Sequence, residues 1–249
     1  MRNWILRIAI VAVAAAGWQS SASAHLRDYL VNQDYWTAKR GEFEVEAYND
    51  MHFDKTGDSG TYHSQHQLEL EYGITDHIQL AYYEVYKWDR TDDWQRDAFK
   101  IEAKARFVEP GQWPLDVALY TEYENPNGTQ ESASDRIENK VILSKDLGRW
   151  NVVGNFVFER PINERSHWAY EYTAGVSYAV FGLTRLGLEV QQSLGDSKHF
   201  AFDGNHALYL VPGIYTSLGS HFRILVGPAF GMTRASEDFQ LRSIVECEF

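Results

Sequence analysis

Residues 98–107 read AFKIEAKARF, and apolar and charged side chains alternate along the whole stretch. The apolar set is Phe99, Ile101, Ala103, Ala105 and Phe107, and the charged set is Lys100, Glu102, Lys104 and Arg106. Successive side chains of a β-strand point to opposite faces, so this two-residue period predicts a strand with one apolar face and one charged face. A helix of about 3.6 residues per turn would scatter both sets around its axis.

The same alternation recurs on both sides of this stretch. Polar breakers of two kinds separate the alternating segments: short ones such as FGL at 181–183, and longer ones such as NPNGTQESASD at 125–135. We expect about twelve strands, near 41–53, 61–72, 77–88, 97–108, 115–124, 136–145, 150–160, 169–180, 184–194, 206–217, 222–232 and 238–249. Most exceed the usual soluble strand of about 5–6 residues and reach the roughly 9–11 residues that a tilted strand needs to cross a bilayer.

The N-terminus predicts export. Arg2 and Arg7 precede an apolar run of about ten residues, and Ala22, Ser23 and Ala24 end in a small-residue cleavage pattern. We interpret residues 1–24 as a signal peptide that is removed before His25. Residues 25–40 lack alternation and form either a periplasmic tail, which is the favoured interpretation, or a small plug inside the barrel. The barrel itself is expected to span residues 41–249.

The last strand carries a further signal. The chain ends IVECEF, with Phe249 terminal and Val245 on the same face. This ending resembles the C-terminal signal that the insertion machinery of outer-membrane barrels reads. With turns such as YGITDHIQLAYY at 72–83 and SYAVFGLTRLGLEV at 177–190, the mature chain resembles the small twelve-stranded outer-membrane barrels of Gram-negative bacteria.

The resemblance implies an all-β fold, a single antiparallel transmembrane barrel in the bacterial outer membrane. Short turns would face the periplasm and longer loops the exterior, as is usual for this class. The implied partners are outer-membrane lipid and the barrel-assembly machinery, which would contact the C-terminal strand. The resemblance supplies no catalytic motif and no substrate, and it leaves the oligomeric state open.

Composition agrees with this interpretation. The formal net charge of −12 disfavours nucleic acid as a partner, since such binding requires basic residues. The single cysteine, Cys247, excludes an internal disulfide. A soluble barrel with a buried apolar face is the alternative. Aromatic residues make up 14% of the chain, and Trp and Tyr recur near strand ends, which favours the two aromatic girdles of a membrane barrel.

Charged residues predicted to face the lumen are the first candidates for function. Glutamates gather where the first, second and last strands meet, and basic residues lie on the fourth strand. These candidates are Glu42, Glu44, Glu46, Glu69, Glu71, Glu246 and Glu248, together with Lys100, Lys104 and Arg106. They could set the ion selectivity of a pore, or they could form a salt-bridged filling that only stiffens the barrel. The sequence favours neither.

Histidines and serines are weaker candidates. His52 could approach His63 across the first hairpin, and an N-terminal His25 could chelate copper, but no zinc-type spacing appears, so we predict neither a metal nor a cofactor. Ser64 and His66 share the predicted lipid face, yet no G-x-S-x-G motif is present and no residue is expected to be catalytic. A passive channel for small polar or ionic solutes is therefore favoured. The alternatives are a structural or binding barrel, such as a partner scaffold or metal-handling protein, and, third, a lipid-modifying enzyme.

Overall fold

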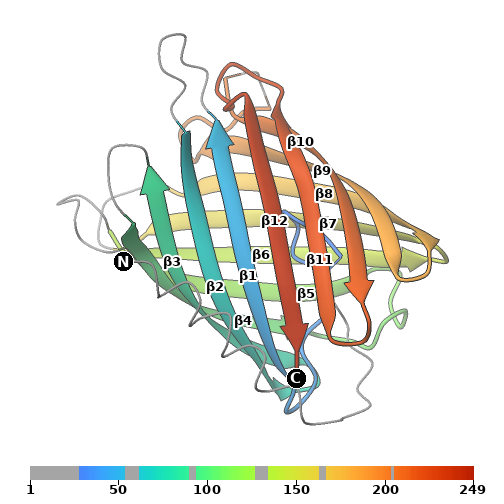
Figure 1. Ribbon diagram of the computed structural model, residues 1–249. Helices are drawn as coiled ribbons and strands as arrows, with labels where there is room; N and C mark the ends of the chain where they lie inside the picture. The colour runs from blue at the N-terminus through green and yellow to red at the C-terminus, as the bar shows by residue number, and fades with distance from the viewer. Residues whose placement is uncertain (1–27, 54–61, 90–93, 127–133, 163–166, 203–204) are drawn as a thin grey trace.

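The computed structural model is a closed barrel of twelve antiparallel strands, which confirms the predicted fold (Figure 1). It describes residues 28–53, 62–89, 94–126, 134–162, 167–202 and 205–249. The predicted signal peptide and His25 lie outside the described residues. The strands are β1 (Phe43–Phe53), β2 (Tyr62–Thr75), β3 (Ile78–Asp89), β4 (Gln95–Arg106), β5 (Asp116–Pro126), β6 (Arg136–Leu147), β7 (Trp150–Pro161), β8 (Ala169–Phe181), β9 (Thr184–Asp196), β10 (Leu208–Leu218), β11 (Phe222–Gly231) and β12 (Phe239–Glu248).

Each strand pairs with its neighbours in sequence, and β12 closes the barrel against β1. The closing register sets Glu44 opposite Glu248 and Ala47 opposite Val245. Closure leaves no strand edge unpaired, which a wall exposed to hydrocarbon requires. Among the described residues, no helix is long and apolar enough to cross a membrane.

The two ends of the barrel differ, as the breakers predicted. At one end, which we call the turn end, β2–β3, β6–β7 and β8–β9 are joined by two residues each, at 76–77, 148–149 and 182–183. We call the opposite end the loop end; it carries the longer connections, such as 197–207 between β9 and β10. The β4–β5 connection, residues 107–115, is the long exception at the turn end.

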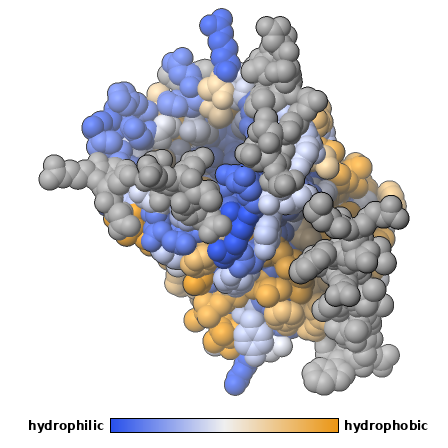
Figure 2. All heavy atoms as spheres, turned by 60° about the vertical axis from the view of Figure 1, so that its left-hand side comes forward, coloured by the Kyte–Doolittle hydropathy of each residue, from blue (hydrophilic) through white to orange (hydrophobic). Residues whose placement is uncertain are grey.

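The faces of the wall are reversed relative to a soluble protein. Leu68, Leu80 and Ile101 on the outer face are 42%, 44% and 50% exposed, whereas Glu69 and Glu102 on the inner face are buried. Figure 2 shows hydrophobic side chains gathered in a belt across one side of the molecule, with hydrophilic residues above it. An apolar exterior around a polar interior is the arrangement of a transmembrane barrel.

This arrangement predicts a large effect of charge on the outer face. Ile101 lies mid-strand on β4, between Tyr82 and Tyr123 of the adjacent strands. We expect Ile101→Arg to lower the free energy of unfolding in lipid bilayers by about 2–4 kcal/mol, the cost of Arg near a bilayer midplane. Urea titration of the liposome-inserted protein measures it, with Ile101→Val as the apolar control. Equal unfolding midpoints for both variants would contradict lipid contact at this face.

Candidate channel constriction

Residues 28–40, which we call the inner segment, lie inside the barrel as far as Ala38, and Lys39 and Arg40 are exposed. In Figure 1 they form the blue trace that passes behind β11 and β12. Tyr29, Leu30 and Asn32 have no exposed surface, and Tyr35 is 1% exposed. Of the two arrangements that the sequence allowed for this stretch, its contacts are those of a segment within the lumen.

A single carboxylate holds the first part of the inner segment. Glu189 of β9 accepts hydrogen bonds at Oε1 from the backbone N–H of Leu30 at 2.8 Å, and at Oε2 from those of Val31 and Asn32 at 2.9 and 2.8 Å. The Asn32 side chain and the Tyr215 hydroxyl donate two more, at 2.9 and 2.8 Å. Consecutive backbone N–H groups that converge on one anion form an anion-binding nest. This buried charge is therefore compensated chiefly by the inner segment.

Glycines on the inner face make room for these contacts. A Cβ added to Gly175 would lie 2.7 Å from the Tyr29 ring, and one added to Gly227 would lie 2.6 Å from the Leu30 side chain. Gly187 likewise leaves no space for a Cβ beside the Tyr215 ring. Glycine inside a strand often marks the close approach of another chain segment. These inward glycines are the feature of the sequence that could have indicated a segment inside the lumen.

The second part of the inner segment reaches the opposite wall. The Gln33 backbone exchanges hydrogen bonds with the Asn155 side chain of β7, at 2.7 and 2.8 Å. The N–H of Ala38 donates to Gln79 Oε1 of β3 at 2.9 Å, and the Tyr35 hydroxyl donates to the Val108 carbonyl. Hydrogen bonds thus hold the inner segment to β9 and β7 on one side of the lumen and to β3 on the other.

Arg106 fixes the inner segment at the turn end. Its guanidinium donates to Thr37 Oγ1 at 3.1 Å and to the Asp76 carbonyl at 2.8 Å, and it packs against the rings of Tyr35 and Trp36. It also bonds Glu109 of the β4–β5 connection at 3.0 Å. The hydrogen bond and charge of Arg106, with a smaller contribution from His77, hold the pKa of Glu109 below its usual range.

The inner segment divides the lumen into unequal spaces. A cavity of about 280 Å³ lies on one side of Val31 and Gln33, and polar or charged groups from several strands line it, including Lys100, Glu122 and Arg242. A second space of about 20 Å³ lies between residues 33–38 of the inner segment and the inner faces of strands β1 to β4. That space holds about one water molecule. The smaller space, beside the inner segment, is the candidate constriction.

Six glutamates lie together on the inner face of three adjacent strands, and three of them, Glu44, Glu46 and Glu71, line this narrow space. Glu44 pairs with Glu71 and Glu248, and Glu46 pairs with Glu69 and Glu246 in the β2–β1–β12 register. We call these six residues the acidic wall; all are at most 6% exposed. The sequence predicted this juxtaposition, since alternation and hairpin pairing determine it. Glu42, the seventh glutamate, lies at the turn end, where it accepts the backbone N–H of Lys39 at 2.7 Å.

Tyr48 and Gln79 donate hydrogen bonds to the acidic wall. The Tyr48 hydroxyl lies 2.5 Å from Glu46 Oε2 and 2.6 Å from Glu69 Oε2, and Gln79 Nε2 donates to Glu71 at 2.8 Å. Glu69 Oε1 and Glu248 Oε2 are buried and make no hydrogen bond to any described residue. Carboxylate side chains that line a pore favour the passage of cations.

The three basic candidates, Lys100, Lys104 and Arg106, form ion pairs with different partners. Lys104 lines the narrow space together with Glu44, Glu46 and Glu71, and its Nζ lies 4.0 Å from Asp34 Oδ1 of the inner segment. Lys100 instead bonds glutamates of the adjacent strand β5: its Nζ lies 3.1 Å from Glu122 and 3.6 Å from Glu124. Arg106 bonds the inner segment and Glu109. Lys104 is the basic candidate that shares the narrow space with the acidic wall.

The remaining candidates lie away from the constriction. His52 and His63 are adjacent near the loop end, with ring centroids 4.5 Å apart. Val245 is 42% exposed on the outer face, and Phe249 extends the β1–β12 pairing through its N–H, which donates to the Phe43 carbonyl at 2.8 Å.

Ser64 and His66 on the outer face are hydrogen-bonded in a chain. His66 Nε2 lies 3.0 Å from Ser64 Oγ, and its Nδ1 lies 2.9 Å from Asn49 Oδ1. Ser64 itself is buried between Met51 and Trp88 of the adjacent strands. These hydrogen bonds satisfy polar groups on the outer face, which lipid could not do.

Comparison with known proteins supports the fold. No family model matches the sequence, and no curated protein matches it. Among solved structures, an outer membrane channel from Pseudomonas putida F1 superposes with a TM-score of 0.64 at 12% identity, covering 89% of this chain and all of that one. The KdgM porin gives 0.58 at 12% identity, and a NanC porin 0.54 at 10%; each covers 83% of this chain, and 99% and 98% of the respective porin. At these identities the similarity establishes the barrel architecture.

The anchoring of the inner segment also makes a stability prediction. Tyr215→Phe keeps the ring against Gly187 and removes only the hydroxyl that donates to Glu189. We expect a loss of about 1.5–3 kcal/mol in the free energy of unfolding, as for other hydrogen bonds to charged groups. Urea unfolding in bilayers measures it, and Tyr72→Phe on the outer face is the matched control. A loss no larger than that of the control would contradict a strong Glu189 anchor.

Proposed function

We propose that this chain is an outer-membrane, porin-like channel for small polar or ionic solutes, with a preference for cations. The turn end faces the periplasm and the loop end the exterior, following the usual loop asymmetry of such barrels. Its fold is that of solved channels and porins. Selectivity arises where solutes pass between the inner segment and the acidic wall.

One observation carries this proposal: the barrel encloses a polar cavity of about 280 Å³ and, beside the inner segment, a narrow space lined by the buried carboxylates of Glu44, Glu46 and Glu71. Burial of charged groups costs free energy, so a barrel that served only as a scaffold would be more stable with an apolar filling than with a polar cavity. Glu69 and Glu248 each direct an oxygen without a hydrogen-bond partner among the described residues into the buried interior. Rings and clusters of carboxylates select cations in channels.

Planar-bilayer recording tests the proposal directly. We expect the purified, folded protein to give small single-channel currents. In a KCl gradient, their reversal potential should show preference for K⁺ over Cl⁻. Heat-modified migration on a gel identifies the folded barrel before reconstitution. Folded protein that passes no current, or that prefers Cl⁻, would overturn the proposal.

A second candidate function, lipid modification, has one observation in its favour. The Ser64–His66–Asn49 chain has the hydroxyl, imidazole and orienting carbonyl of a nucleophilic relay, on the face that contacts lipid. Release of fatty acid from phospholipid vesicles by the wild-type protein, abolished by Ser64→Ala, would establish it. Because Ser64 is only 3% exposed, we favour the structural role and expect equal, background release from both proteins.

A further inference from the structure

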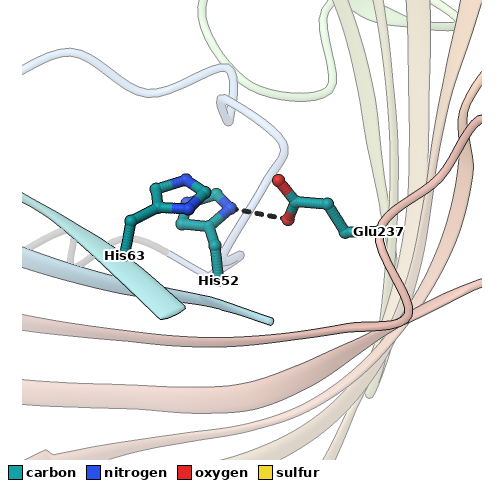
Figure 3. A group of neighbouring side chains, drawn as sticks. All are labelled: His52, His63 and Glu237. Atoms are coloured by element: carbon teal, nitrogen blue, oxygen red, sulfur yellow. Dashed lines mark hydrogen bonds and ion pairs between the residues drawn. The ribbon is translucent and has the colours of Figure 1, made fainter. Parts of the chain in front are cut away.

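Three side chains from separate elements converge inside the mouth of the barrel at the loop end (Figure 3). His52 lies near the end of β1, His63 near the start of β2, and Glu237 in the connection between β11 and β12. His52 Nδ1 is 2.8 Å from Glu237 Oε2, and the His63 ring stacks on the His52 ring with an interplanar angle of 9°. One ligand atom from each residue lies within 4.8 Å of the other two.

The two histidines are placed by strand register. His52 and His63 occupy directly opposed positions of the β1–β2 hairpin, on the same inward face as Glu46 and Glu69. Directly opposed side chains of an antiparallel pair have Cβ atoms roughly 4.5–5.5 Å apart. The pairing of β1 with β2 therefore places the two imidazoles side by side.

Glu237 is held in position from three directions. Its backbone N–H donates to the Tyr209 hydroxyl at 3.0 Å, and Gln240 Nε2 donates to its carboxylate at 2.9 Å. A Cβ added to Gly231 would lie 1.8 Å from the Glu237 carbonyl oxygen, so glycine at that position allows the connection to fold back over the mouth. The carboxylate is fixed toward the histidines before any ligand arrives.

We propose that His52, His63 and Glu237 form a binding site for a transition-metal dication of the Zn²⁺ class. Imidazole nitrogen suits zinc, copper and nickel, whereas carboxylate and carbonyl oxygen alone would favour calcium or magnesium. Two histidines and one glutamate supply three ligands, and water occupies the fourth position of a tetrahedral zinc site. Small rotations of the stacked rings bring the three donor atoms to about 2.0–2.2 Å from one ion.

Neighbouring residues already support these ligands. Gln240 bonds the Glu237 carboxylate, and the adjacent inward position below His52 holds the Asp50–Arg242 ion pair, with Arg242 Nε 2.6 Å from Asp50 Oδ1. Arg242 neutralises Asp50, so the aspartate does not compete for the metal. An ion bound here would stand inside the loop-end mouth, above the 280 Å³ cavity, which Arg242 also lines.

Zinc titration of the tag-free, chelator-treated protein in detergent tests the site. We expect isothermal titration with ZnCl₂ to show one saturable site in the wild-type chain. His52→Ala and His63→Ala should each weaken it by about tenfold or more, and Glu237→Gln should also weaken it, as the loss of ligands and their partners does in other metal sites. His66→Ala is the matched control, because His66 lies on β2 but on the outer face, against Trp94.

Several outcomes would overturn the site. Absence of saturable zinc binding to folded wild-type protein is one, and unchanged affinity in both His52→Ala and His63→Ala is another. Competition by excess Ca²⁺ would assign the bound ion to the carboxylates of the acidic wall instead. Heat-modified gel migration shows that each variant is folded. The titration measures no current, so the channel proposal and the metal site can fail independently.

Discussion

Glu189→Ala is expected to increase the single-channel conductance several-fold over that of the wild-type chain. Glu189 accepts five hydrogen bonds, four of them from the backbone and side chain of Leu30, Val31 and Asn32. Their loss leaves three backbone N–H groups facing an apolar methyl group, and each buried donor without a partner costs roughly 1–3 kcal/mol. The first part of the inner segment, residues 30–32, therefore leaves β9, and the lumen beside it widens.

The comparison with a second lumenal glutamate isolates this effect. Glu171 of β8 lines the 280 Å³ cavity and accepts hydrogen bonds from Gln191 at 3.1 and 3.2 Å, a partner on the wall rather than in the inner segment. Glu171→Ala removes the same charge and volume, so it should change conductance little. Deletion of residues 28–38 should match Glu189→Ala. If the deletion widens the pore and Glu189→Ala does not, Glu189 is not the anchor.

Strand positions were predictable because each strand carries its own pattern. The strand expected at 150–160 is observed at Trp150–Pro161, and that expected at 184–194 at Thr184–Asp196. Alternation is a local property: one face must suit lipid and the other a polar lumen, and every strand meets this requirement separately. The β1–β2 pairing of the acidic wall follows from hairpin register in the same way, and closure of the barrel adds β12.

The inner segment was not predictable in this way, because its position depends on residues distant in sequence. Leu30 is bound by Glu189, and Tyr29 by Asn151, more than 100 residues away along the chain. A short segment without periodicity contains no sequence pattern that indicates which strands it contacts. Lys100 illustrates the opposite case: its partner Glu122 lies on the next strand, β5, so strand register brings the two side chains together.

Replacing both Glu46 and Glu69 by glutamine is expected to abolish most of the cation preference. These carboxylates lie opposite each other across the β1–β2 pair and are at most 3% exposed, and Glu46 lines the narrow space beside the inner segment. Charges that line the narrowest part of a pore determine its selectivity more than charges in a wide vestibule. The measurement is the reversal potential in a KCl gradient, which should move toward zero. Glu122→Gln, in the wide cavity and paired with Lys100, is the control.

The same double variant should also be more stable than the wild type. Glutamine keeps the shape of each side chain and adds donors, while it removes like charges that repel each other in a medium of low dielectric constant. If the acidic wall only stabilised the barrel, this repulsion would weaken that role. Functional sites commonly retain destabilising groups because activity needs them. Increased stability together with lost selectivity in Glu46→Gln/Glu69→Gln would therefore identify the acidic wall as a functional feature. Decreased stability with unchanged selectivity would identify it as bracing.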